Sequence, residues 1–163
     1  MFYFYCRLAY ETRIGYVDVK SSPVYFYVQR YNVFNTIMTP IPFDVERLNV
    51  GGAMNSTTGK FTAPKDGTYA FSFTGDAWFP ATSSRGNLDL YMSLNSNSIG
   101  WGWADEVSNA TEMETFSFQS TFNLVAGDQI WLEIAYISAG AYLRGVFYTQ
   151  FSGYLLEENI AFA

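Results

Sequence analysis

The sequence alternates apolar and polar residues in many short segments, and this pattern constrains the fold more than any other feature. The clearest example is the segment 88–94, whose even positions are Leu88, Leu90, Met92 and Leu94. Successive side chains of a β-strand point to opposite faces of the sheet, so such alternation indicates a strand with one buried face. The same period of two recurs in four further segments, at residues 24–29, 69–73, 116–124 and 130–136.

Stretches rich in Gly, Pro, Asn, Asp and Ser separate these segments and predict turns between short strands. Residues 116–124 and 130–136 keep one phase on either side of Ala126-Gly127-Asp128, so we expect a β-hairpin there. No window shows the apolar spacing of three and four that an amphipathic helix requires. Aromatic residues make up 20% of the chain, and flat rings pack well on a pleated surface. These observations predict an all-β fold of eight to ten short strands, arranged as a sandwich or jelly roll.

A chain of 163 residues is long enough for one domain with its own core and too short for two. The strand pattern predicts a globular domain over residues 23–159, an irregular lead-in over residues 1–22 and a tail over residues 160–163. The apolar start Met1–Cys6 is too short and too aromatic for a signal peptide, so we expect a leader to be missing from this chain. Cys6 is the single cysteine, which excludes an intrachain disulfide and leaves a bond between chains open.

One stretch carries aromatic residues, an asparagine and a glycine at a regular spacing. The framework residues, in chain order, are Phe43, Asn49, Met54, Phe61, Gly67, Tyr69, Phe71 and Phe73. This framework resembles the signature of the C1q globular domain. Met54 is the one departure, because the family usually has an aromatic residue or Leu there, and a flexible apolar side chain should fill the same space. Phe151 and Gly153, in Phe-Ser-Gly-Tyr-Leu-Leu, are similar to the last strand of that family, and the resemblance covers residues 24–157.

The resemblance implies a ten-stranded jelly-roll β-sandwich of the C1q and tumour necrosis factor-like type, which assembles as a homotrimer. It also implies a secreted protein without a collagen stalk that acts in innate immune or cell-surface recognition. The framework residues are expected to be scaffold, since burying each ring contributes roughly 1.5–3 kcal/mol. Two alternatives stay open: a trimeric cytokine-like ligand for a receptor, and a structural protein of the extracellular matrix.

The chain contains no histidine, which removes the usual nucleophile activation, most general-base schemes and the common zinc sites. We therefore predict no enzyme and assign no catalytic or cofactor-binding residue. No apolar run approaches the ~20 residues that a membrane-spanning helix needs.

The net charge is −6, and the segment from Gly86 to Leu143 holds seven acidic residues and no basic one. Such a surface disfavours nucleic acid and could attract cations or a basic partner, or it could simply be a solvated face. Calcium is a candidate ligand for this stretch, but the sequence does not show which carboxylates converge.

The motif Gly100-Trp-Gly-Trp-Ala-Asp-Glu106 is the best candidate for a ligand surface. Trp101 and Trp103 point the same way on a strand, and Asp105 and Glu106 lie just beyond, so a carbohydrate ring or a protein loop could stack there. The alternative, which we favour from the sequence, places both rings in the core or between subunits.

Two glycosylation acceptor motifs support an extracellular location. Asn55 in Asn-Ser-Thr and Asn109 in Asn-Ala-Thr both lie in polar, turn-like segments, where a glycan would be tolerated.

Overall fold

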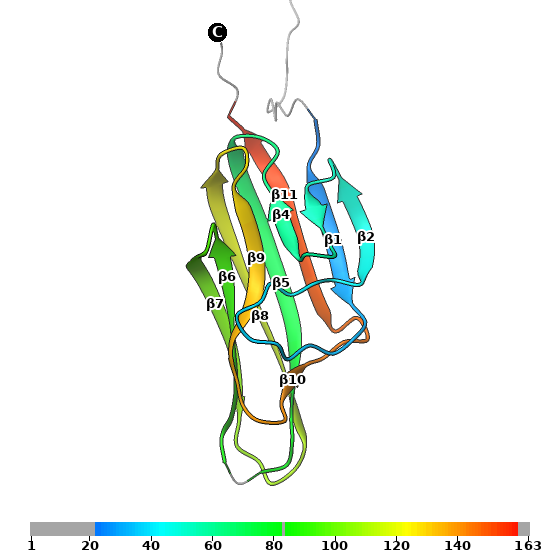
Figure 1. Ribbon diagram of the computed structural model, residues 1–163, viewed down its shortest axis with the longest axis vertical. Helices are drawn as coiled ribbons and strands as arrows, with labels where there is room; N and C mark the ends of the chain where they lie inside the picture. Colours follow the sequence, from blue (N-terminus) through cyan, green and yellow to red (C-terminus); the bar gives the residue numbers. More distant parts are fainter. Residues whose placement is uncertain (1–21, 83, 160–163) are drawn as a thin grey trace, which may run out of the picture.

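The computed structural model describes residues 22–82 and 84–159, and these residues form a sandwich of two antiparallel sheets without a helix (Figure 1). Sheet A contains β1 (Tyr25–Arg30), β2 (Val45–Val50), β5 (Gly67–Phe79), β8 (Glu112–Leu124), β10 (Tyr142–Leu143) and β11 (Thr149–Glu158). Sheet B has the order β3 (Met54–Asn55), β4 (Lys60–Thr62), β9 (Gln129–Ile137), β6 (Gly86–Leu94) and β7 (Asn97–Glu106). The predicted all-β jelly-roll sandwich is confirmed. Its strand count exceeds the expected eight to ten, because β3 and β10 are two-residue strands that alternation cannot reveal.

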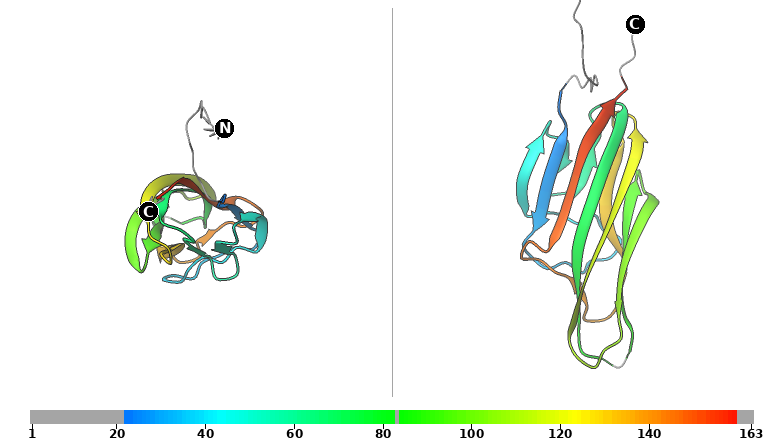
Figure 2. Two further views of the ribbon diagram at one scale, coloured as in Figure 1. Left: turned by 90° about the horizontal axis from the view of Figure 1, so that it is seen from above. Right: turned by 180° about the vertical axis from the view of Figure 1, so that it is seen from behind.

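The two sheets enclose one aromatic core, and Figure 2 shows the sandwich that they form from above and from behind. Residues of β5 alternate between buried and partly exposed along most of the strand, as the period of two predicts. The ring of Phe26 packs against those of Phe61, Phe71 and Phe151, with the centroids of Phe26 and Phe151 5.0 Å apart, and the centroids of Phe61 and Phe71 are 5.2 Å apart. The core is therefore built by aromatic residues that come from β1, β4, β5 and β11.

The framework residues lie mostly in the core, which agrees with a scaffold role. Phe43, Phe61, Gly67, Tyr69, Phe71, Phe73, Phe151 and Gly153 are all buried. Asn49 joins two strands: its side-chain amide donates to the carbonyl oxygen of Met54 (2.7 Å), and its side-chain oxygen accepts from the N–H of Met54 (3.2 Å). At Gly153, a Cβ atom would lie 2.6 Å from ring atoms of Phe26 and Phe71, so this position of β11 has no room for a side chain.

The predicted hairpin between residues 116–124 and 130–136 is wrong. β8 pairs with β5 in sheet A, whereas β9 pairs with β4 and β6 in sheet B, so the turn at Gly127 carries the chain from one sheet to the other. Both strands bury one face in the same core from opposite sides, and alternation alone cannot distinguish this arrangement from a hairpin. The phase also breaks within β9: a register shift leaves Tyr136 exposed, and Ile137 packs against the core instead.

Two polar clusters hold the loops near the start of β11. Arg30 is buried, and its guanidinium donates to the carbonyl oxygens of Pro42 and Val33. Burial lowers the pKa of Arg30, and the negative charge of Asp44 opposes that shift. For Asp44, burial raises the pKa, but hydrogen bonds from the Tyr31 and Asn32 N–H groups together with Arg30 outweigh it, so the net pKa is lowered.

The second cluster is an ion pair between β5 and the segment that follows β10. The carboxylate of Asp76 is buried on β5 and lies 2.5 Å from the guanidinium of Arg144, which follows β10. The backbone N–H of Arg144 also donates to the carbonyl oxygen of Asp76 (2.7 Å). The pair therefore joins β5 to the segment that leads into β11.

Both ends of the described chain lie at the same end of the sandwich (Figure 1). The predicted lead-in, with Cys6, and the predicted tail fall almost wholly outside the described residues, so these domain bounds stay predictions. Within the described part of the chain, no helix is long and apolar enough to cross a membrane.

Candidate functional site

The candidate site lies on the outer face of sheet B, where β6 and β7 form a hairpin. A two-residue turn joins Leu94 to Asn97, and its residues Asn95 and Ser96 have positive φ values of 49° and 75°. Such a turn matches the twist of the two strands and holds them in one register. That register pairs Tyr91 with Trp101 and Asp89 with Trp103.

The tryptophans point outward on either side of Gly102, where the inner face of β7 has no room for a side chain. A Cβ atom at Gly102 would lie 2.7 Å from the ring of Phe118 on β8. The alternate residues face solvent instead, and the exposed fraction is 66% for Trp101 and 58% for Trp103. The expectation that these rings lie in the core of the chain is therefore wrong. Their burial between subunits stays a prediction.

The exposed rings border an open pocket of about 330 Å³. It is lined by Asp89, Tyr91, Ser98, Trp101, Gly102 and Trp103. Three aromatic faces and one carboxylate thus share a hollow on the surface, and such a mixture of flat apolar rings and few polar groups is typical of ligand sites.

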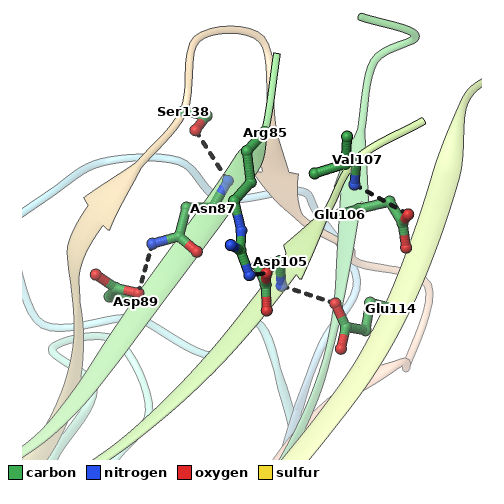
Figure 3. A network of polar contacts seen from close by, with 8 residues as sticks. All are labelled: Arg85, Asn87, Asp89, Asp105, Glu106, Val107, Glu114 and Ser138. Carbon is green, nitrogen blue, oxygen red and sulfur yellow. Dashed lines mark hydrogen bonds and ion pairs between the residues drawn. The ribbon is translucent and has the colours of Figure 1, made fainter. Parts of the chain in front are cut away.

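Asp105 and Glu106 follow the tryptophans in the sequence and differ in their contacts, which Figure 3 shows. Asp105 shares the outward face of β7 with the tryptophans and forms an exposed ion pair with Arg85, while its N–H donates to Glu114 (2.7 Å). Glu106 falls on the alternate face of the strand, and its carboxylate accepts from the N–H of Val107 (3.0 Å). Of the four residues assigned to the ligand surface from the sequence, the structure brings Trp101, Trp103 and Asp105 to one face and leaves Glu106 outside it.

Asp89 and Tyr91 are the pocket residues that the motif alone did not identify. Their outward direction follows from the alternation of Leu88, Leu90 and Met92, but their position beside the tryptophans depends on the pairing of β6 with β7. The dipeptide Asn95-Ser96 between two alternating segments was the signal for that hairpin. The side-chain amide of Asn87 donates to one oxygen of Asp89 (3.0 Å) and so orients its carboxylate (Figure 3).

The same outer face continues across β9. Tyr136 lies beside Asp89, and Glu133 lies beside Tyr91 and accepts from the hydroxyl of Ser93 (2.8 Å). Two residues before Glu133 on β9, Trp131 pairs with Lys60 of β4, and the ammonium of Lys60 lies 4.5 Å from the ring centroid of Trp131. The outer face of sheet B is therefore aromatic and acidic, and it already holds one cation over a tryptophan.

The acidic residues of the base-free segment do not gather into a metal site within the part of the chain that the structure describes. No group of three or more Asp, Glu, His or Cys side chains lies close enough there to hold an ion. Glu112 and Glu114 instead accept hydrogen bonds, from the hydroxyl of Ser108 (3.2 Å) and the N–H of Asp105. Calcium binding therefore has no side-chain cluster to support it among these residues.

The two glycosylation acceptors are both exposed. Asn55 ends β3, and its side-chain oxygen accepts from the N–H of Thr58 (3.1 Å) in a surface turn. Asn109 lies in the loop between β7 and β8. Neither side chain packs in the core, so an attached glycan would meet no steric barrier from the sandwich.

Comparisons with known proteins place the chain in a family. The C1q domain family matches residues 9–156. Caprin-2 of Danio rerio is 30% identical over 124 residues, which is 76% of this chain and 13% of that protein. Complement C1q tumor necrosis factor-related protein 5 of Rattus norvegicus is 32% identical over 130 residues, which is 74% of this chain and 47% of that protein. The chain thus spans less than half the length of these curated relatives.

A solved structure shares the fold. The globular domain of zebrafish complement 1qA protein superposes with a TM-score of 0.60 at 20% sequence identity, covering 83% of this chain and 99% of that one. The framework residues, the sandwich of two antiparallel sheets and the match over residues 9–156 agree, and this chain belongs to the C1q domain family.

Proposed function

We propose that this chain is an extracellular C1q-domain recognition module, which assembles as a homotrimer and binds protein or carbohydrate ligands. The observation that carries the proposal is the difference between the two outer faces of the sandwich. The outer face of sheet B bears an open aromatic pocket with a carboxylate, whereas three adjacent rows on the outer face of sheet A hold no charged residue across β1, β11, β5 and β8.

Sheet A supports the assembly. Three adjacent rows of outward side chains cross it without a charged residue: Val50, Tyr25, Tyr154, Ala70 and Thr121; Leu48, Tyr27, Ser152, Ser72 and Gln119; and Gln29, Gln150, Thr74 and Ser117. The cores of subunit interfaces are depleted of charged residues and enriched in tyrosine. Tyr25 and Tyr154 lie side by side with exposed fractions of 40% and 50%. We therefore assign this face to the contact between subunits, with Arg47 at its border, where it donates to Gln29 (2.8 Å).

Sheet B supports recognition. Its tryptophans are exposed, its pocket is open, and the three copies of a trimer would present three such pockets. Linked weak sites bind a multivalent surface with an avidity that can exceed the single affinity by about 10²–10⁴. A shallow pocket is therefore sufficient for useful binding.

An extracellular location is supported by the exposed acceptors Asn55 and Asn109. A role without catalysis is supported by the absence of histidine from the sequence and by the recognition role of the C1q family. The name of the rat relative couples C1q with tumour necrosis factor, so a trimeric ligand for a receptor is the second candidate.

Two measurements test the proposal. Sedimentation velocity should give the mass of a trimer, and a stable monomer would contradict the assembly. Binding to a glycan array and to arrays of cell-surface ectodomains should then be compared with the double variant Trp101→Ala/Trp103→Ala. Loss of binding in the variant supports recognition through sheet B. Unchanged binding would refute it, and selective capture of a single receptor would favour the ligand role.

A further inference from the structure

The pocket on sheet B combines three aromatic side chains with one carboxylate at the corners of a rectangle. Along β7, Trp101 and Trp103 are two residues apart, a spacing of about 6.5–7 Å, and each faces a partner on β6. Tyr91 is the partner of Trp101, and Asp89 is the partner of Trp103. A flat group that enters between the two tryptophans therefore meets a ring on either side and a carboxylate at the edge.

Among the described residues, the pocket carries a negative charge that no neighbouring base neutralises. Asp89 has one hydrogen bond there, from the amide of Asn87, and no ion pair. The two basic side chains that reach this face are already engaged, Arg85 with Asp105 and Lys60 with Trp131. Glu133 on β9 lies next to Tyr91 and adds a second negative charge beside the pocket.

An arginine side chain satisfies both features of this pocket. A guanidinium is planar and weakly hydrated, stacks on aromatic faces, and donates to a carboxylate through two parallel N–H groups. The ammonium of lysine is a more strongly hydrated point charge and stacks less well. A phosphate or another anion would meet Asp89 and Glu133 at close range and be repelled. Lys60 over Trp131 shows that this same sheet face accepts a cation on a tryptophan ring.

Resting on the proposed recognition function of sheet B, we propose that this pocket binds an arginine side chain of a basic segment on a partner protein. Trp101 and Trp103 stack on the guanidinium, Tyr91 covers its third side, and Asp89 accepts its N–H groups. The charge of the base-free segment attracts the partner, and the trimer raises the strength of a contact that is weak at each single pocket.

The test uses the whole chain labelled with ¹⁵N and titrated with short synthetic peptides. One peptide carries arginine between glycine and serine residues, one carries lysine, and one carries citrulline, which has the shape of arginine without its charge. The chain has four tryptophans, so four indole N–H signals report binding, and the variants Trp101→Phe and Trp103→Phe assign two of them.

The arginine peptide should shift the signals of Trp101 and Trp103 and leave those of Trp78 and Trp131 in place. Citrulline should bind at least about tenfold more weakly, and the arginine affinity should fall as salt is added. Asp89→Asn and Trp103→Ala should each weaken binding about 3–5-fold or more. Glu157→Gln removes an exposed carboxylate from sheet A and should leave binding unchanged.

Equal binding of the arginine and citrulline peptides would overturn the proposal, as would an arginine affinity that Asp89→Asn does not change. The absence of any shift up to 10 mM peptide would overturn it as well. Failure of the arginine proposal is distinguishable from failure of the proposed recognition function. If glycans or proteins still bind and the tryptophan variants abolish that binding, sheet B recognises a neutral ligand and only the arginine assignment is wrong.

Discussion

Removing the ring of Phe61 tests the assignment of the framework residues to the scaffold. Phe61 is fully buried on β4 and lies between three other rings, with centroid distances of 5.5 Å to Phe26, 5.5 Å to Tyr69 and 5.2 Å to Phe71. Phe→Ala in a core costs about 3–5 kcal/mol, and lost aromatic pairs each add about 0.5–1.5 kcal/mol to the effect of burial. We therefore expect Phe61→Ala to lower the free energy of unfolding by about 4–5 kcal/mol.

The expected change in melting temperature follows from the size of the domain. The unfolding entropy is about 2.1 cal/mol/K per residue, or about 0.3 kcal/mol/K for ~140 residues, so the melting temperature should fall by about 13–17 °C. The assay is guanidinium and thermal unfolding followed by circular dichroism. It is repeated at several protein concentrations, because an oligomer is stabilised by mass action.

Trp103→Ala is the matched control, since it removes a larger ring that is 58% exposed. It should change the free energy of unfolding by less than about 1 kcal/mol, because surface substitutions away from special features have small effects. A loss below about 1.5 kcal/mol in Phe61→Ala would refute the reasoning, and so would a loss of similar size in both variants.

Three further predictions concern assembly, the buried ion pair and acid stability. Ser72→Glu places a charge in the middle of the three neutral rows of sheet A and should convert a trimer to monomers in sedimentation velocity, whereas Ser98→Glu on sheet B should leave the trimer intact. Equal masses for both variants would contradict the assigned face. Arg144→Met leaves the carboxylate of Asp76 buried without its cation, so it should lower the free energy of unfolding by about 3–5 kcal/mol in a guanidinium titration. The double variant Arg144→Met/Asp76→Asn should recover most of that free energy, because it removes the buried charge as well. The lowered pKa of Asp44 means that its charged form stabilises the fold above pH ~4, and this contribution is lost as the pH falls through the folded-state pKa. Asp44→Asn should therefore be less stable than the wild type at pH 7, and thermal melts should show the difference shrinking below pH ~4; a constant difference would contradict the shift.

The fold could be predicted from the sequence because the framework residues suit few environments. Phe61, Phe71 and Phe73 each need a large apolar space, and Gly153 is needed where Phe26 and Phe71 leave no room for a Cβ atom. The spacing of such residues reflects where strands pass through one core. The spacing of the framework residues therefore indicated the fold before any contact between them was known.

The candidate site could be predicted only in part. The motif identified Trp101 and Trp103 as a pair on one face, and the base-free segment indicated where acidic charge would lie. Glu106 was misplaced, because strand alternation puts it on the other face of β7, and Asp89 was missed, because its approach to Trp103 is a cross-strand contact.

Alternation by itself indicated the buried face of β1, β5, β6 and β8, and of β9 as far as Ile134, and the aromatic framework indicated the family of the fold. Only the tertiary structure decided that β8 and β9 lie in different sheets and that β6 and β7 form one edge of sheet B. It also decided that the tryptophans face outward, because Phe118 of β8 occupies the space beneath Gly102. The physical reason is that a period of two records the burial of a strand face, whereas pairing and outer-face contacts depend on residues distant in sequence. The core residues of this protein could therefore be predicted from the sequence, whereas the face that we propose for binding could be identified only from the fold.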